Sequence, residues 1–301
     1  VSIVLAQSAG FCYGVRRAVH LAVQAAESGK PCAMLGPIIH NENVVEYLQS
    51  LGVAMVGSPA EISDGCSVIL RSHGEGRAVC EALERRGLEI VDATCPNVSR
   101  IHKLVREAGK EGRSVLIVGY ESHPEVKAIA GWCPNSAVVE TPADIERWLN
   151  EDKGRREAPV TLVAQTTLTH EMWEAAVEKT KKECTNLKIF DTICNATCKR
   201  QQEAVELSAR CDAMIVVGGR ESSNTRRLYE LCLAQCPQVI WIGRAAELEP
   251  SALRGKASIG ITAGASTPGW IIKEVYDKMS DENFEIEESF AEMLEKSIKT
   301  L

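Results

Sequence analysis

Short apolar runs rich in β-branched residues alternate with amphipathic stretches of helical periodicity along most of this 301-residue chain. Runs such as 114–119 and 213–218 are apolar at nearly every position rather than at every second one. A strand of that kind is buried on both faces, as in a parallel sheet with helices on each side. Strands are expected over 2–6, 67–71, 88–92, 114–119, 160–165, 213–218, 239–243 and 257–262, and helices from near Tyr13, Asn43, Glu75, Asn97, Thr169, Ala196, Asn224 and Pro268. The pattern predicts an α/β fold with parallel sheets.

One type of segment recurs and predicts related domains. The sequences VDATCPNVSRIHKLV and FDTICNATCKRQQEAV each combine an apolar strand, Asp-x-x-Cys and a helix with basic residues in its first turns. A looser copy, VLAQSAGFCYGVRRAV, lies near the N-terminus. The aligned cysteines are Cys12, Cys95 and Cys194, and their separations of 83 and 99 residues match the size of a small α/β domain. We expect three similar domains over 13–95, 96–193 and 194–279, followed by a tail over 280–301.

Composition limits the classes of protein to which the chain can belong. It has 12 cysteines but no C-x-x-C pair, which disfavours zinc ribbons and thioredoxin-type motifs. No apolar run is long enough to span a membrane, and the N-terminal segment lacks the basic region of a signal peptide. The net charge of −7 gives no basic face for nucleic acid. We therefore expect a cytoplasmic protein with reduced cysteines.

The three aligned cysteines are candidates for a metal or iron–sulfur site. Each is expected at a strand-to-helix junction, where helix N-terminal amides favour a thiolate. Three thiolates converging on one point would hold a 4Fe-4S cluster and leave one iron open to substrate. Single cysteines are more often small buried packing residues, and we interpret the other nine in that way. Cys198, one helical turn after Cys194, is the alternative third ligand.

Each third of the chain also has two polar loops where strands are expected to end. Three of these loops contain a histidine, namely His40, His73 and His123. Ligands of parallel sheets bind beyond the carboxyl ends of the strands, and imidazole donors suit an anion. In the last third, hydroxyl and amide side chains occupy the equivalent loops: Ser222, Ser223, Asn224 and Ser266. We interpret them as an anion site at helix N-termini, although plain N-capping explains each residue singly.

Glu125 follows His123 in the sequence SHPE. A carboxyl group beside a cluster and a bound anion would have a shifted pKa, which suits proton delivery. The alternative is a first-turn acid that stabilises the helix dipole. The chain has no P-loop and no dinucleotide-binding fingerprint, which weighs against nucleotides.

The chain resembles the 4-hydroxy-3-methylbut-2-enyl diphosphate reductases, the terminal enzymes of the methylerythritol phosphate route to isoprenoids. The resemblance runs from about Ser2 to Asp277 and is carried, in order, by GFCYGVRRAV, GPIIHN, RSHGE, VDATCPNV, SHPEV, QTTL, FDTICNAT, ESSNTRRL and TAGASTP. It implies three α/β/α domains in a pseudo-threefold trefoil around a central 4Fe-4S cluster. It also implies reductive removal of the substrate hydroxyl by two electrons and two protons, which yields isopentenyl and dimethylallyl diphosphate.

The resemblance implies a role for each candidate residue. The cluster ligands are Cys12, Cys95 and Cys194, with Cys198 standing where the family commonly has threonine. The substrate-binding residues are His40, His73, His123, Ser222, Ser223, Asn224 and Ser266. The catalytic residues are Glu125 as proton donor, His123 in the same cavity, and Thr166 or Thr167 near the substrate hydroxyl. Because no flavin or nicotinamide motif is present, ferredoxin or flavodoxin is the expected electron donor.

Two other functions would use the same cysteines. An iron–sulfur hydro-lyase would turn over without added reductant, and a cluster-based or zinc-based sensor would not bind a diphosphate. Either observation would separate it from the reductase.

Residues 280–301 are acidic and then amphipathic. Phe290, Met293, Leu294 and Ile298 recur at helical spacing, which predicts a C-terminal helix. The segment also resembles the lead-in to the RNA-binding OB-fold repeats of the largest small-subunit ribosomal protein, which some anaerobic bacteria fuse to this reductase. We therefore expect a linker to a missing domain, dispensable for the reductase chemistry.

Overall fold

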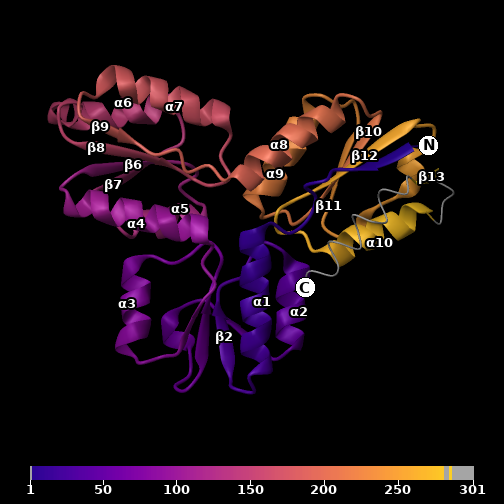
Figure 1. Cartoon of the computed structure of the whole chain (residues 1–301), viewed down its shortest axis with the longest axis horizontal. Coiled ribbons are helices and arrows are strands. Elements are labelled where there is room, and N and C mark those ends of the chain that lie inside the picture. Colours follow the sequence, from indigo (N-terminus) through magenta and orange to yellow (C-terminus); the bar gives the residue numbers. More distant parts are fainter. Residues whose placement is uncertain (1, 281–284, 287–301) are drawn as a thin grey trace. The chain divides into compact units, whose positions relative to one another are not determined.

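The computed structural model contains three parallel sheets with helices on their faces (Figure 1). It describes residues 2–280 and 285–286. The chain divides into two compact units. The first runs to His20 and includes Ile39–Leu48 and the chain from Asn195 onward; the second comprises Leu21–Ile38 and Gln49–Cys194. One sheet belongs to the first unit and two belong to the second.

The sheet of the first unit combines both ends of the chain. Its strand order is β11-β10-β12-β1-β13. The bounds are β1 (Ser2–Leu5), β10 (Ala213–Val217), β11 (Val239–Ile242), β12 (Ser258–Ala263) and β13 (Glu285–Ile286). Strand β1 pairs with β12 in the register Ile3↔Ile259, so the N-terminal strand completes a sheet built from residues more than 200 positions later.

The second unit contains two four-stranded sheets. The order in one is β3-β2-β4-β5 and in the other β7-β6-β8-β9. The bounds in the first are β2 (Cys32–Leu35), β3 (Ala54–Val56), β4 (Ser67–Leu70) and β5 (Ile90–Asp92). Those in the second are β6 (Ser114–Val118), β7 (Ser136–Val139), β8 (Val160–Ala164) and β9 (Leu187–Ile189).

All three sheets share one topology. If β10, β11, β12 and β1 are counted as first to fourth, each sheet has the spatial order second, first, third, fourth. The chain leaves the first strand toward one edge and the third strand toward the other, so a crevice opens between their carboxyl ends. The topology therefore predicts a ligand-binding edge at the same place in every sheet.

Helices cover both faces of the sheets. Their bounds are α1 (Tyr13–Glu27), α2 (Glu42–Ser50), α3 (Arg77–Arg85), α4 (Pro96–Lys110), α5 (Pro124–Ala130), α6 (Pro142–Glu151), α7 (His170–Glu183), α8 (Asn195–Ser208), α9 (Ser223–Leu233) and α10 (Gly269–Ser280). On β10, Ile215 packs in the core that contains residues of α10, whereas Met214 packs in the core that contains residues of α8 and α9. Alternate residues of one strand thus enter two cores.

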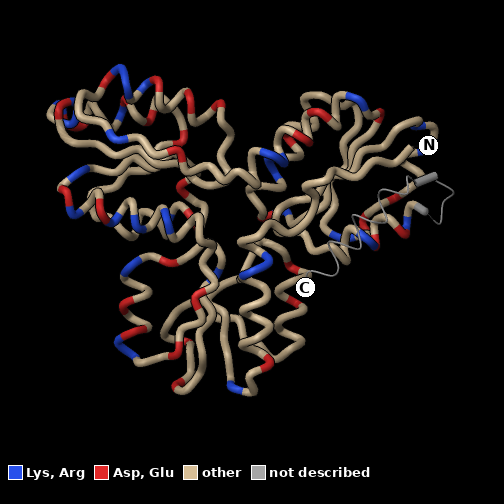
Figure 2. The backbone as a smooth tube through the Cα atoms, viewed as in Figure 1, with Lys and Arg blue, Asp and Glu red and all other residues tan. Residues whose placement is uncertain are grey.

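The central strands carry no charge, as Figure 2 shows for β6, β8, β10 and β12. All five residues of β8 and all five of β10 are buried. Burial of apolar surface, which contributes about 25 cal/mol of folding free energy per Å², is the dominant stabilising term for such strands. The prediction of an α/β fold with parallel sheets is confirmed.

Some elements were not expected from the sequence. Strands β2, β3 and β7 are only three or four residues long, and helix α5 has seven residues. Length alone does not explain why these strands were missed, because β1, β4 and β5 are equally short and were predicted. Apart from Glu285–Ile286, the predicted tail after Ser280, including its proposed helix, lies outside the described residues. In the described part of the chain, no helix is long and apolar enough to cross a membrane.

Candidate functional site

The candidate cysteines occupy equivalent places in the three sheets. Each follows the fourth strand of its sheet and immediately precedes a helix: Cys12 comes before α1, Cys95 before α4 and Cys194 before α8. In every case the cysteine N–H donates a hydrogen bond to the loop after the third strand of the same sheet. The acceptors are the carbonyl oxygens of Ala265 (3.1 Å), Ser72 (2.9 Å) and Thr166 (3.0 Å), respectively. Each cysteine is therefore bonded to a loop that carries a candidate substrate residue.

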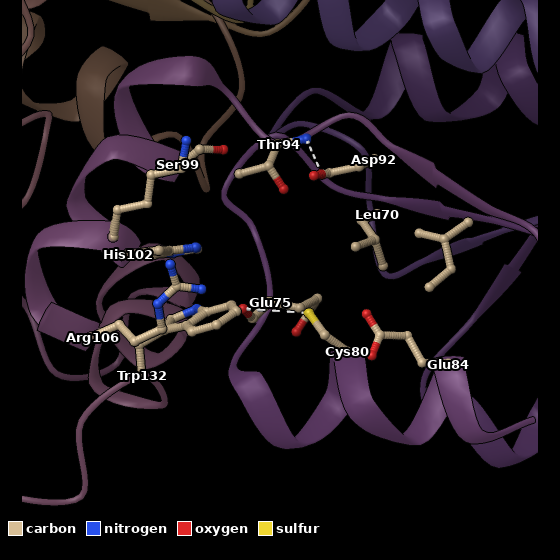
Figure 3. Close-up of a pocket in the computed structure, with 12 residues that line it drawn as sticks. Leu70, Glu75, Cys80, Glu84, Asp92, Thr94, Ser99, His102, Arg106 and Trp132 are labelled. Atoms are coloured by element: carbon tan, nitrogen blue, oxygen red, sulfur yellow. Dashed lines mark hydrogen bonds between the residues drawn. The ribbon is translucent and has the colours of Figure 1, made fainter. Parts of the chain in front are cut away.

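The Asp-x-x-Cys motif has a local structural cause. Asp92 Oδ1 accepts a hydrogen bond from the N–H of Thr94 at 2.9 Å (Figure 3), and Asp191 Oδ1 accepts one from Ile193 at 3.0 Å. An aspartate that bonds the backbone two residues later forms a compact turn. The turn ends the strand and leads directly into the cysteine, which explains why the motif recurs.

The N-terminal copy lacks this aspartate and is held by α8 instead. Glu203 accepts hydrogen bonds from the backbone N–H groups of Gln7 and Ser8, at 2.5 and 2.9 Å. Buried Arg200 donates to the carbonyl oxygen of Gly10 at 2.7 Å. Both contacts link residues about 190 positions apart, and sequence patterns carry no signal for them.

The candidate ligands differ in burial from most other cysteines. All three are half-buried, whereas seven of the other nine are buried and serve as packing residues. Cys80 is half-buried, but burial and the carboxylates around it raise its pKa to about 11, which disfavours the thiolate. Cys198 is also half-buried, so exposure does not exclude it as a ligand. The side chain of Asn97, on α4, donates to Cys194 Sγ at 3.2 Å.

Glu125 and Thr166 form a buried pair in the second unit. Glu125 is 2% exposed. Its carboxyl group accepts hydrogen bonds from the N–H of Thr166 at 2.6 Å and from the Thr166 hydroxyl at 2.7 Å. Burial raises the pKa of Glu125, and the two hydrogen bonds from Thr166 act in the opposite direction. Thr167 is oriented differently, since its hydroxyl accepts from Gln165 Nε2 at 2.8 Å. The raised pKa favours a carboxyl group that keeps its proton.

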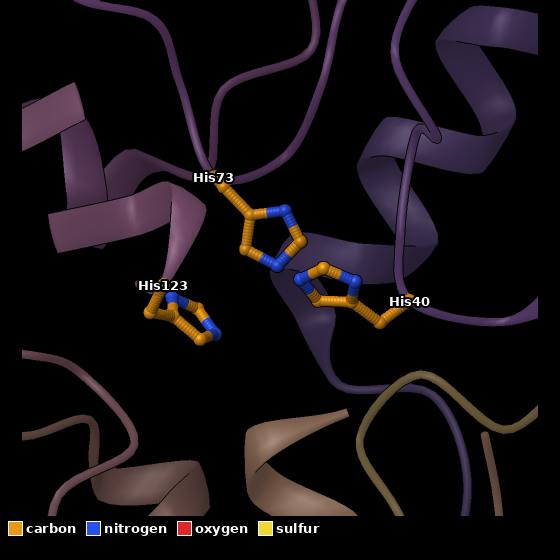
Figure 4. A group of neighbouring side chains, drawn as sticks. All are labelled: His40, His73 and His123. Atoms are coloured by element: carbon orange, nitrogen blue, oxygen red, sulfur yellow. The ribbon is translucent and has the colours of Figure 1, made fainter. Parts of the chain in front are cut away.

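Two of the candidate histidines come together in the second unit. The rings of His73 and His123 meet edge to face with centroids 5.6 Å apart, and Figure 4 labels both. His123 is the N-cap of α5, and its Nδ1 accepts from the N–H of Glu125 at 3.2 Å. A neutral His123 therefore carries its proton on Nε2.

The remaining candidates lie in the first unit. Ser222 caps α9, since its hydroxyl accepts from Thr225 N–H at 3.2 Å, and its oxygen lies 3.4 Å from Ser266 Oγ. Ser266 donates to the carbonyl oxygen of His40 at 3.2 Å. Gly219 passes so close that a Cβ there would lie 2.7 Å from the same oxygen, which explains the glycine.

Asn224 is the most informative of these residues. It is 4% exposed, and neither of its side-chain polar atoms has a hydrogen-bond partner among the described residues. Leaving a buried amide unpaired costs about 1–3 kcal/mol of folding free energy per group. An arrangement of this kind points to a ligand that supplies the partners.

Fold and site together define an α/β protein whose three like sheets present cysteines, histidines and hydroxyl groups at their strand ends. The LytB protein family model matches residues 3–280. A curated 4-hydroxy-3-methylbut-2-enyl diphosphate reductase of Clostridium tetani is 43% identical over 287 residues, which cover 94% of this chain and 44% of that protein. The enzyme of the same name from Citrifermentans bemidjiense is 40% identical over 281 residues, or 93% of this chain and 97% of that one.

Solved structures give the same result. One is titled as the structure of (E)-4-hydroxy-3-methyl-but-2-enyl diphosphate reductase, the terminal enzyme of the non-mevalonate pathway. It is 40% identical, with a TM-score of 0.70 over 93% of this chain and 99% of that one. The E-1-hydroxy-2-methyl-but-2-enyl-4-diphosphate reductase of Plasmodium falciparum is 26% identical, with a TM-score of 0.87 over 95% of this chain and 90% of that one. The chain belongs to the LytB family of 4-hydroxy-3-methylbut-2-enyl diphosphate reductases.

Proposed function

We propose that this chain converts (E)-4-hydroxy-3-methylbut-2-enyl diphosphate to isopentenyl and dimethylallyl diphosphate. Two electrons and two protons enter, the C4–O bond breaks, a C–H bond forms at one end of the allylic system, and the hydroxyl leaves as water. The observation that carries the proposal is the hydrogen bond repeated in all three sheets from a cysteine N–H to the substrate-side loop. This linkage ties each candidate cluster ligand to a candidate substrate-binding loop.

The donor set fits an iron–sulfur cluster. Cys12, Cys95 and Cys194 are half-buried thiols at helix starts, where backbone N–H groups favour the thiolate. We assign these three residues as the ligands and Cys198 as a neighbour. A 4Fe-4S cluster held by three cysteines supplies electrons and, at its open iron, Lewis-acid activation of the substrate hydroxyl.

Glu125 is the proton donor in this proposal. Its buried carboxyl group retains a proton because ionisation in the low-dielectric interior is costly. Thr166 orients the carboxyl group through two hydrogen bonds, and we assign Thr166 rather than Thr167 to the substrate hydroxyl. His123 accepts from the N–H of Glu125 and keeps its Nε2–H for the substrate side.

The diphosphate is bound by the hydroxyl, amide and imidazole groups of the strand-end loops. Ser222, Ser223 and Asn224 open α9, whose free N–H groups and dipole favour an anion. The unpaired amide of Asn224 supplies a further donor. The hydroxyl of Ser266 becomes another when it turns from the carbonyl oxygen of His40 to the diphosphate. His40, His73 and His123 complete the proposed set, and charge-assisted hydrogen bonds from such groups are about twice as strong as neutral ones.

Electrons come from a separate protein, since the residues of the proposed site offer no group that could store them other than the cluster. A ferredoxin or flavodoxin fits this requirement. The test is an anaerobic assay of reconstituted protein with the diphosphate substrate and a reduced viologen dye. Formation of both products with stoichiometric dye oxidation is expected. Turnover without reductant would indicate a hydro-lyase, and no binding of the diphosphate would indicate a sensor.

A further inference from the structure

The loop that carries His73 is a tight turn between β4 and α3. Gly74 adopts a φ of +74°, and its N–H donates to the carbonyl oxygen of Arg71 at 3.0 Å. Ser72 donates to the carbonyl oxygen of Ile38 at 3.0 Å. These bonds define the backbone on one side of the loop. The contacts on its other side come from α4 and from the residues after α5, which cover the neighbouring sheet of the same unit.

Two aromatic rings hold that other side (Figure 3). Trp132, which follows α5, donates its indole Nε1–H to the carbonyl oxygen of Glu75 at 3.0 Å. His102, on α4, lies against Gly74 so closely that a Cβ at this position would overlap its Cε1 atom. The two rings stack with centroids 5.4 Å apart and an interplanar angle of 25°. Because burial lowers the pKa of His102 to about 4, the imidazole is neutral near pH 7 and acts by packing.

Helix α5 links these contacts to the proposed catalytic groups. His123 and Glu125 stand at its N-terminal end, where His73 meets the ring of His123. At its C-terminal end, Gly131 approaches the chain after the loop so closely that a Cβ there would lie 2.8 Å from Gly76 Cα. The segment from His73 to Gly76 is therefore in contact with both ends of one short helix.

A cavity of about 370 Å³ lies beside the stacked rings of His102 and Trp132. Its lining includes Glu75, Thr94, His102 and Trp132 (Figure 3). A loop that borders a cavity has fewer packing contacts to hold it than one embedded in a core. The position of the loop therefore depends more strongly on the indole hydrogen bond of Trp132 and on the packing of His102 against Gly74.

We propose that Trp132 and His102 are positioning residues that hold the His73 loop so that its imidazole faces the substrate diphosphate. The inference rests on the proposed function in assigning His73 to the diphosphate. Releasing the loop should weaken diphosphate binding while leaving Glu125, Thr166 and the cysteines in place. Losing one hydrogen bond to a charged group corresponds to a roughly 10- to 100-fold rise in KM, with kcat nearly unchanged.

The first test replaces the indole donor. Trp132→Phe removes the Nε1–H and keeps an aromatic ring against His102. Trp148→Phe is the matched control, because Trp148 lies on α6 at the other face of the sheet (Figure 1). Trp132→Phe should raise KM about tenfold or more with unchanged kcat and iron content, and Trp148→Phe should change neither. Equal KM values for the two variants would overturn the inference, as would a fall in kcat alone.

The second test uses glycines. Gly74→Ala and Gly87→Ala both place a side chain at positive φ, +74° and +64°, but nothing lies within 4 Å of the added atom at Gly87. Gly74→Ala should raise KM, and Gly87→Ala should not. The added Cβ would also lie 3.1 Å from Thr94 Cγ2, but its severest overlap is with His102, so Gly74→Ala combined with His102→Ala should raise KM by less than the product of the two single effects. Fully additive effects would contradict the role assigned to His102.

A binding measurement separates this inference from the proposed function. Titration of wild type and Trp132→Phe with inorganic diphosphate needs no turnover. Weaker binding by the variant supports the positioning role even if the wild type fails to reduce the allylic substrate. Equal binding by the two proteins overturns it even if the wild type is an active reductase.

Discussion

Replacing Glu125 by glutamine separates proton delivery from substrate binding. Glutamine keeps the shape of the side chain, and its carbonyl oxygen can still accept from Thr166 N–H in place of Oε1. Its NH₂ group takes the place of Oε2 and faces Thr166 Oγ1, so this hydroxyl must change from donor to acceptor. The hydrogen bond between the two side chains is thereby kept with its direction reversed, and the cost is the Thr166 hydroxyl hydrogen left without an acceptor, about 1–3 kcal/mol.

The loss of the acid is larger. A positioned general acid contributes about 10²–10⁴ in rate, which is about 3–5 kcal/mol of activation free energy. The expected outcome is a hundredfold or greater fall in kcat with a KM within about tenfold of wild type. The assay is steady-state dye oxidation under anaerobic conditions, with Glu121→Gln as control, since Glu121 is an exposed carboxylate in the same loop. A Glu125→Gln variant with nearly normal kcat at neutral pH would refute the assignment.

The pH dependence of stability gives an independent check on the same carboxyl group. Because burial raises the pKa of Glu125 in the folded state, the folded protein retains the proton above the unfolded pKa of about 4.3. The stabilisation is full below that pH and is lost as the pH rises through the raised value. Thermal unfolding should therefore show wild type losing stability relative to Glu125→Gln as the pH rises from about 4. A constant difference in Tm across that range would contradict the raised pKa.

Three further predictions concern other parts of the molecule. Asn224→Ala should weaken diphosphate binding about tenfold or more with little loss of stability, because the buried amide has no partner among the described residues to lose; calorimetry with inorganic diphosphate would measure it. Asn97→Leu removes the donor to Cys194 Sγ and should lower the reduction potential of a bound cluster by up to about 59 mV, a tenfold change in a one-electron equilibrium; an unchanged potential in a dye titration would contradict this. Deleting 281–301 should leave reductase activity intact, since every proposed cluster ligand and substrate-binding residue precedes this segment; loss of activity would show that the segment is required.

The parts of the fold that the sequence predicts are those encoded by local pattern. Strand β10 has five successive buried residues and was predicted, whereas β3, with three residues and none fully buried, was not. The repeated Asp-x-x-Cys motif predicted Cys95 and Cys194 at strand-to-helix junctions because the aspartate turn acts within three residues. Pairing of β1 with β12 depends on residues more than 250 positions apart, which no local periodicity encodes.

In the candidate site, too, the features encoded by local sequence were predictable and the contacts between distant segments were not. Polar strand-end loops were recognisable because they interrupt apolar runs, and the structure shows Glu125 bonded to Thr166 rather than to Thr167. The contacts of Trp132 with Glu75 and of Arg200 with Gly10 join segments that share no pattern. Such contacts are specified by tertiary packing, so a single sequence gives no signal for them.

The most direct test of the account is the iron and sulfide content of four cysteine variants after anaerobic reconstitution. The variants Cys12→Ser, Cys95→Ser and Cys194→Ser should lose most of their iron and all reductive turnover. Cys198→Ser should keep four irons per chain, as expected for the wild type, and remain active. A Cys198→Ser variant that loses the cluster, together with a Cys194→Ser variant that keeps it, would contradict the assignment of the ligands.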